Sequence, residues 1–65
     1  MSEIDVRAIR VKLGLSQSEF ADRYHISLRT LQQWEQSRSE PDGPVRAYLK
    51  VIAHAPGAVE RALNR

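Results

Sequence analysis

Apolar residues recur every three or four positions along the whole chain, and no segment alternates strictly between apolar and polar residues. This spacing gathers apolar side chains on one face of a helix, whereas alternation would indicate a strand. A chain of 65 residues has room for one small domain. We therefore predict an all-α fold over residues 1–65, a compact bundle of about five short helices that forms a single domain.

Capping residues mark the ends of the first three expected helices. Ser2 can cap the first helix, and Gly14 can end it because only glycine adopts a left-handed backbone without steric cost. Ser16 and Glu19 have the spacing of a capping box, in which each side chain bonds the backbone amide of the other residue. Ser27 can cap the third helix.

Prolines mark the last two helices. Residues 37–44 have the composition of a turn, and Pro44 and Pro56 suit the first position of a helix, where a missing N–H has no consequence. Val59, Ala62 and Leu63 then share one side of the last helix. The other apolar side chains expected to face inward are Ile4, Val6, Ile9, Leu13, Phe20, Ala21, Tyr24, Ile26, Leu31, Trp34, Val45, Tyr48, Leu49 and Ile52.

Residues 16–38 read as a helix, a tight corner and a second helix. With Gln17 counted as the first position, the small Ala21 falls fifth, where the two helices must cross. Ile26, Leu31 and Trp34 fall tenth, fifteenth and eighteenth, positions that must be buried to hold the second helix across the first. Together with the capping box, this spacing predicts a helix-turn-helix.

The runs IRVKLGLSQSEFA (residues 9–21) and ISLRTLQQWEQ (residues 26–36) resemble the Xre family of helix-turn-helix repressors, and within it the HigA-type antitoxins. The resemblance extends from residue 9 to about residue 52 and implies a lambda-repressor-like DNA-binding domain. It further implies a transcriptional repressor that binds double-stranded operator DNA. Two residues depart from the family pattern, because His25 and Ser37 stand where glycine is usual. The corner at His25 is expected to need a positive φ, which histidine tolerates better than a branched residue.

The outward face of the third helix carries the candidate base contacts. Because Leu31 and Trp34 point inward, one arginine and three glutamines must cover the opposite side of this helix. Arginine can bond guanine at O6 and N7, glutamine can bond adenine at N6 and N7, and an apolar side chain can touch the thymine methyl group. In the docking mode of the family the N-terminal end of this helix enters the major groove. We expect base contacts from Leu28, Arg29, Gln32 and Gln33, with a plain solvated helix face as the alternative.

Phosphate contacts are expected around the same surface. Gln17 stands at the start of the second helix, where free amides and the helix dipole favour an anion. The net charge is only +2, but eight of the ten cations are arginine, the residue that grips phosphate with a planar fork. The arginines can equally be plain surface charge, and the serines plain caps. The full expected set is Arg10, Ser16, Gln17, Ser27, Thr30, Arg38 and Arg46.

A second copy of the chain is the expected protein partner. A half-site read by three or four side chains gives limited discrimination, and the family usually binds palindromes as two-fold dimers. The last helix offers more apolar surface than so small a core should need. The expected dimer interface is Ala58, Val59, Ala62 and Leu63.

Two functions remain open. The first is an autorepressor that binds its own operator, and the second is an antitoxin that mainly neutralises a partner toxin, with DNA binding secondary. Antitoxins of this branch usually carry a further segment outside the helix-turn-helix. We therefore expect either a minimal repressor or, slightly favoured, the DNA-binding part of a longer antitoxin.

An enzyme is not expected. The chain has no cysteine, its two histidines stand far apart in sequence, and the serines are accounted for as helix caps. No cofactor and no metal are therefore expected. The acidic start lacks the pattern of a signal peptide, and no apolar run is long enough to span a bilayer, so we expect a cytoplasmic protein that does not contact membranes.

Overall fold

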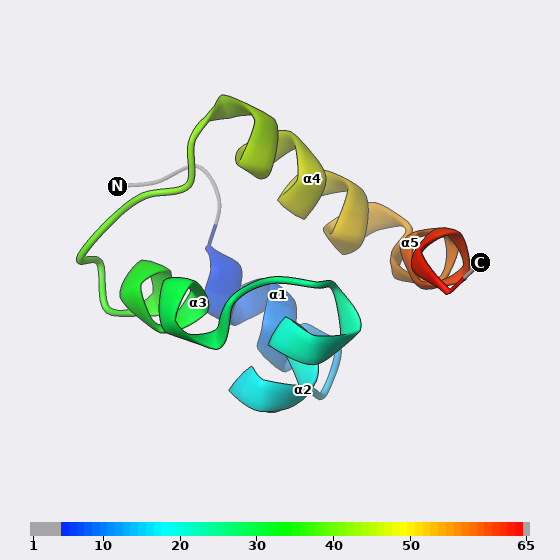
Figure 1. Cartoon of the computed structure of the whole chain (residues 1–65), viewed down its shortest axis with the longest axis horizontal. Helices are drawn as coiled ribbons and strands as arrows, with labels where there is room; N and C mark the ends of the chain where they lie inside the picture. Colours follow the sequence, from blue (N-terminus) through cyan, green and yellow to red (C-terminus); the bar gives the residue numbers. More distant parts are fainter. Residues whose placement is uncertain (1–4, 65) are drawn as a thin grey trace.

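A computed structural model describes residues 5–64, and this part of the chain contains five α-helices and no strand (Figure 1). The all-α prediction is confirmed. The helices are α1 (Val6–Lys12), α2 (Gln17–Arg23), α3 (Leu28–Glu35), α4 (Gly43–His54) and α5 (Pro56–Leu63). None of the helices in residues 5–64 is both long enough and apolar enough to cross a membrane.

The first helix begins and ends at short-range bonds. Its cap is Asp5, whose carboxylate accepts a hydrogen bond from the amide of Ala8 at 3.1 Å. The predicted cap Ser2 lies outside the described residues, and because Asp5 caps the helix, the predicted start of this helix is wrong. Gly14 follows the helix with φ 72°, the left-handed backbone predicted for it. This turn redirects the chain into α2.

The next two helices have the predicted caps. The Glu19 amide donates to the Ser16 hydroxyl at 3.1 Å, and the Ser16 amide donates to the Glu19 carboxylate at 2.9 Å, so the capping box of α2 is confirmed. The Ser27 hydroxyl accepts from the Thr30 amide at 3.4 Å at the start of α3. These local bonds fix where both helices of the motif begin.

The start of α4 differs by one residue from the prediction. Asp42 caps the helix by accepting from the Val45 amide at 3.2 Å, so the helix begins at Gly43 and Pro44 lies within its first turn. The Asp42 carboxylate accepts a hydrogen bond from the first turn, which proline cannot do, so the helix begins one residue earlier than predicted. Pro56 begins α5 as predicted, and the single residue Ala55 separates it from the end of α4.

Side chains from all five helices form one core. Phe20 and Leu31 are fully buried, which locks α2 against α3. Trp34 and Ile26 were predicted to be buried, but both are only partly buried and pack against this core. The buried residues of this core are Val6, Phe20, Ala21, Tyr24, Leu31, Leu49, Ile52 and Val59.

Two tyrosine hydroxyls attach the last two helices to α2. Figure 1 shows α1, α2 and α3 gathered in one half of the molecule, with α4 across them and α5 at the far end. Tyr48 of α4 donates to the carbonyl of Tyr24 at 2.7 Å, and Tyr24 donates to the carboxylate of Glu60 in α5 at 3.0 Å. These two hydrogen bonds therefore hold the C-terminal helices to the end of α2 in the helix-turn-helix.

Candidate nucleic-acid interface

The corner between α2 and α3 sets the direction of α3. His25 has φ 59°, as predicted for this corner, and the amide of Ile26 donates to the carbonyl of Ala21 at 2.8 Å. Ala21 is 5% exposed, which lets the two helices approach closely. Ser37, directly after the cap of α3, has φ 58°. Both non-glycine residues hold a left-handed backbone at the two ends of the segment that contains α3.

One side of α3 lies inward and the opposite side faces solvent. Leu31 is fully buried, whereas Arg29 is exposed and Leu28 is 38% exposed. Gln32 and Gln33 are partly exposed. The structure thus places all four candidate base-reading side chains on the accessible part of the helix.

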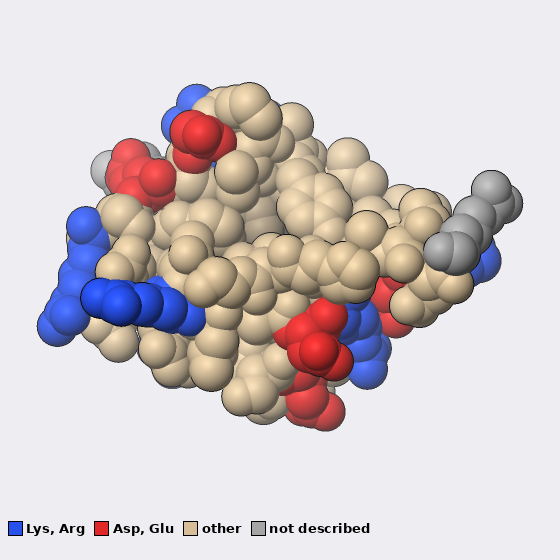
Figure 2. All heavy atoms as spheres, viewed as in Figure 1, with Lys and Arg blue, Asp and Glu red and all other residues tan. Residues whose placement is uncertain are grey.

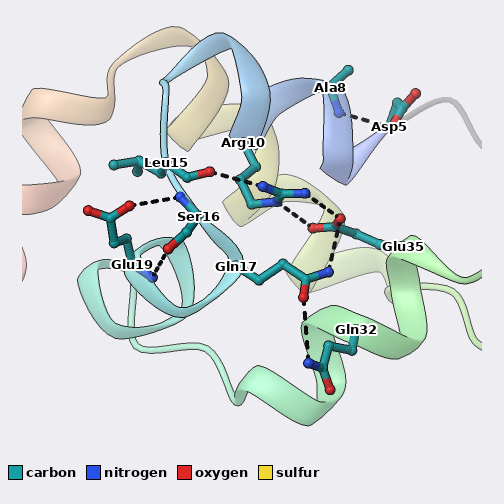
Figure 3. Close-up of polar contacts among 9 residues, drawn as sticks. All are labelled: Asp5, Ala8, Arg10, Leu15, Ser16, Gln17, Glu19, Gln32 and Glu35. Carbon is teal, nitrogen blue, oxygen red and sulfur yellow. Dashed lines mark hydrogen bonds and ion pairs between the residues drawn. The ribbon is translucent and has the colours of Figure 1, made fainter.

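A chain of polar contacts links α1, α2 and α3 (Figure 3). Arg10 of α1 donates from Nε to Glu35 Oε2 and from Nη2 to Glu35 Oε1, both at 2.8 Å, and from Nη1 to the carbonyl of Leu15 at 2.9 Å. Gln17 Nε2 donates to Glu35 Oε1 at 3.3 Å, and Gln32 Nε2 donates to Gln17 Oε1 at 3.5 Å. We refer to Arg10, Glu35, Gln17 and Gln32 as the polar chain.

Arg10, which is expected to bind phosphate, lies in an ion pair within the protein. Its side chain is 14% exposed and its guanidinium binds a carboxylate with the two-point geometry that also suits phosphate. Arg10 joins α1 to the end of α3 through these bonds, and we do not include it among the proposed phosphate contacts.

Glu35 was not identified from the sequence. Its side chain is 5% exposed, and the hydrogen bond from Arg10 is the main cause that holds its pKa below the usual value for glutamate. The same bond raises the pKa of Arg10. One signal could have indicated this residue, because Glu35 stands four positions after buried Leu31 and so faces the same side of α3. A buried carboxylate in that place needs a cationic partner.

The other expected phosphate ligands lie around the N-terminal ends of α2, α3 and α4, except Arg38, which lies in the loop after α3. Ser16 and Ser27 accept cap bonds through their hydroxyl oxygens, which leaves each O–H free to donate. Arg38 and Arg46 are exposed, and neither forms an ion pair with another described residue. Thr30 is partly exposed. On the face shown in Figure 2, basic side chains lie at the end where α3 and the loop after it lie, with acidic side chains above them, and a second acidic group lies over α2 with a basic side chain beside it.

The predicted dimer residues of α5 do not form one free patch. Val59 is only 7% exposed and belongs to the core, and Leu63 packs partly against it. Ala58 and Ala62 are exposed. Val59 is therefore the least accessible of the four predicted residues, since the monomer already buries most of its side chain.

Metal ligands are not clustered in the part of the chain that the structure describes. Among residues 5–64 no group of three or more His, Cys, Asp or Glu side chains could hold a metal ion.

The fold and the sequence both match known proteins. The family described as Helix-turn-helix matches residues 6–45. Antitoxin HigA-2 of Vibrio cholerae is 38% identical over 56 residues, which cover 86% of this chain and 54% of that protein, so the chain spans about half the length of this curated relative. The crystal structure of a HTH XRE-family like protein from Agrobacterium tumefaciens is 56% identical, with a TM-score of 0.89, and the match covers 91% of this chain and 95% of that one. The chain belongs to the Xre-type helix-turn-helix family of DNA-binding regulators.

Proposed function

We propose that this protein is a sequence-specific transcriptional repressor that inserts α3 into the major groove of operator DNA. The observation that carries the proposal is the exposed side of α3, where Arg29 and Gln33 reach solvent while Leu31 on the opposite side is buried. A helix held this way can present its side chains to base edges without unfolding any part of the core. The function is one of binding alone, and it needs no cofactor and no catalytic group.

Base reading is assigned to the N-terminal half and the centre of α3. Arg29 is suited to a guanine, Gln32 and Gln33 to bases with exposed amino or ring-nitrogen groups, and Leu28 to a thymine methyl group. Phosphate binding is assigned to Ser16, Gln17, Ser27, Thr30, Arg38 and Arg46. Gln17 keeps one N–H free after its bond to Glu35, and this group lies at the start of α2.

The operator is proposed to be a palindrome bound by two copies of the chain. A single α3 reads only a few base pairs, and a two-fold dimer doubles the length of the recognised site. The contact between copies is assigned to the exposed side of α5, where Ala58 and Ala62 lie, together with the exposed part of Leu63. A repressor of its own operon acts where the chromosome is, in the cytoplasm.

Selection of bound duplexes from a random pool tests this function directly. The expected result is an enriched motif with two inverted half-sites about one helical turn apart. The matched control is the Arg29→Ala variant, which keeps the fold but is expected to lose enrichment at one position in each half-site. If the wild-type protein enriches no motif above the random pool, the repressor function is wrong.

A second function is favoured by the likeness to Antitoxin HigA-2, namely the neutralisation of a partner toxin. Growth of cells that express a toxin encoded in the same operon separates the two functions. If the chain is an antitoxin, growth is restored both by the wild-type protein and by Arg29→Ala, since binding to a protein does not need base contacts. If neither restores growth while operator binding is intact, the toxin-neutralising function is absent from this chain.

A further inference from the structure

The hydrogen bonds of the polar chain can run in only one order of donors and acceptors. An arginine can only donate hydrogen bonds, and an ionised carboxylate can only accept them. Arg10 gives Glu35 two donors at 2.8 Å, and the lowered pKa of Glu35 keeps that carboxylate ionised near neutral pH. Glu35 Oε1 therefore meets Gln17 only through the amide nitrogen of Gln17, at 3.3 Å. A glutamine that is otherwise free to turn its amide over is held in one orientation.

The orientation of Gln17 is passed on to Gln32. With Nε2 turned toward Glu35, Gln17 presents Oε1 to the side chain of Gln32, and only an N–H can bond to that oxygen. The amide nitrogen of Gln32 lies 3.5 Å from it. The carbonyl oxygen of Gln32 is then turned away from Gln17. Figure 3 shows Gln32 of α3 at the end of this sequence of contacts, with its amide nitrogen turned toward Gln17.

We propose that Glu35 is a positioning residue for specificity, which acts through Gln17 to make Gln32 present its carbonyl oxygen to the DNA. This inference rests on the proposed function, because it assumes that the exposed side of α3 faces base edges. An outward carbonyl oxygen accepts from the amino group of adenine (N6) or cytosine (N4), and it meets only acceptors at O6 of guanine or O4 of thymine. At the position that Gln32 faces, the operator strand carries adenine or cytosine.

Exchanging the charges of residues 10 and 35 reverses the order of donors and acceptors along the polar chain and keeps the ion pair. In the double variant R10E/E35R, residue 35 becomes a pure donor, so Gln17 must turn Oε1 toward it and Nε2 toward Gln32. Gln32 then turns its own Oε1 inward and its Nε2 outward. The expected result of duplex selection is that adenine or cytosine at this one position is replaced by guanine or thymine, while the remaining positions of the motif stay as in the wild-type protein. An unchanged motif in a folded double variant overturns the proposal.

Gln17→Met provides a second test should the double variant fail to fold. Methionine matches glutamine in length but has no amide group that could donate to Glu35 and accept from Gln32. The Arg10–Glu35 pair stays intact in this variant. The expected result is that the preference at this single position falls by severalfold or more, since Gln32 can then turn either way. Lys50→Met is the matched control, because Lys50 is exposed on α4 and lies outside the polar chain. Equal preference in Gln17→Met and the wild-type protein overturns the proposal.

The orientation can also be measured without DNA, which separates this inference from the repressor function. In nuclear magnetic resonance spectra of the free protein, the side-chain amide protons of Gln17 are expected to show contacts to the Glu35 side chain, and those of Gln32 to the Gln17 side chain. If the wild-type protein selects no DNA motif but shows these contacts, the repressor function fails and the positioning by Glu35 stands. If the contacts are missing, the positioning by Glu35 is wrong, whatever DNA the protein binds.

Discussion

Arg10 and Arg29 belong to two helices that contact each other, and they differ in what lies beside them. Arg10 is paired with Glu35 and is 14% exposed, whereas Arg29 is exposed and forms no ion pair within the described residues. The sequence alone does not distinguish these two arginines. In the structure, Arg10 lies beside a carboxylate and links two helices, whereas Arg29 has no such neighbour among residues 5–64 and can bind a ligand. Residue type alone therefore does not identify a DNA contact.

Arg29→Ala is expected to weaken operator binding by about 1–3 kcal/mol and to relax the base preference at one position. The reason is that arginine bonds two acceptors of guanine, and alanine bonds neither. Titrations against the selected operator and against single-base variants measure both effects.

Arg38→Ala is the matched comparison, because this residue is assigned to phosphate. It is expected to weaken operator and random DNA by similar factors and to flatten the dependence of affinity on salt. If the two variants behave alike on operator and random duplexes, the division into base and phosphate contacts is wrong.

Tyr24 is expected to make stability depend on alkaline pH. It is 1% exposed, and burial is the main cause that raises its pKa to about 12, well above the value of about 10 for an unfolded tyrosine. A raised pKa contributes stability that is complete below about pH 10 and is lost as the pH rises toward about 12. Urea unfolding of the wild-type protein and Tyr24→Phe between pH 8 and pH 11.5 measures this contribution. The advantage of the wild-type protein is expected to shrink above about pH 10, and an advantage that stays constant contradicts the assignment.

At the scale of the helices, backbone strain in the turns between helices affects the free energy of unfolding. His25 and Gly14 both have a left-handed backbone, at φ 59° and φ 72°, but only glycine adopts it without strain. His25→Gly is expected to raise the free energy of unfolding by up to about 1 kcal/mol. Gly14→Ala is expected to lower it by about 1 kcal/mol, and this loss comes from the backbone alone because nothing lies within 4 Å of the added methyl group.

Urea unfolding of both variants measures these changes, with Ser37→Gly as a second case at φ 58°. The opposite signs are the critical result. A loss of stability in His25→Gly would mean that the imidazole makes a contact worth more than the relief of backbone strain.

Most helix boundaries could be predicted because caps act over three or four residues. Ser16, Glu19 and Ser27 make the bonds that their spacing indicates. The start of α4 was missed by one residue because Asp42 and Pro44 both favour a helix start, and the carboxylate bond takes precedence. The face of α3 was predictable from periodicity. Local rules therefore account for the elements and for the side that α3 exposes.

The polar chain could not be predicted in the same way. Arg10 and Glu35 are 25 residues apart, and no local pattern states that α1 and the end of α3 meet. Once they meet, the bond between these two side chains occupies Arg10 and orients two others, Gln17 and Gln32. The roles within the site thus depend on tertiary contacts that the sequence pattern leaves open.

At the scale of the whole molecule, stability depends on a small core shared by every helix. Leu31→Ala is expected to lower the free energy of unfolding by about 2–5 kcal/mol, a large part of what a domain of this size possesses. Leu28→Ala is the matched control on the same helix, because Leu28 is 38% exposed and its loss is expected to lower the free energy of unfolding by about 1 kcal/mol or less.

Thermal unfolding followed by circular dichroism compares the two leucine variants. The loss of melting temperature on removing Trp34 is expected to lie between those of the two leucine variants, because Trp34 is only partly buried against the core. Trp34→Ala is accordingly expected to lower the melting temperature less than the loss of a fully enclosed tryptophan would. Equal melting temperatures for Leu31→Ala and Leu28→Ala would contradict the assignment of the inward side of α3.

The inward position of Val59 separates two properties that share one helix. The side chain that fastens α5 to its own monomer is buried at 7% exposure, while Ala58 and Ala62 stand on the outside of the same helix. The outer residues of α5 can therefore be substituted without removing the side chain that holds this helix to its own monomer.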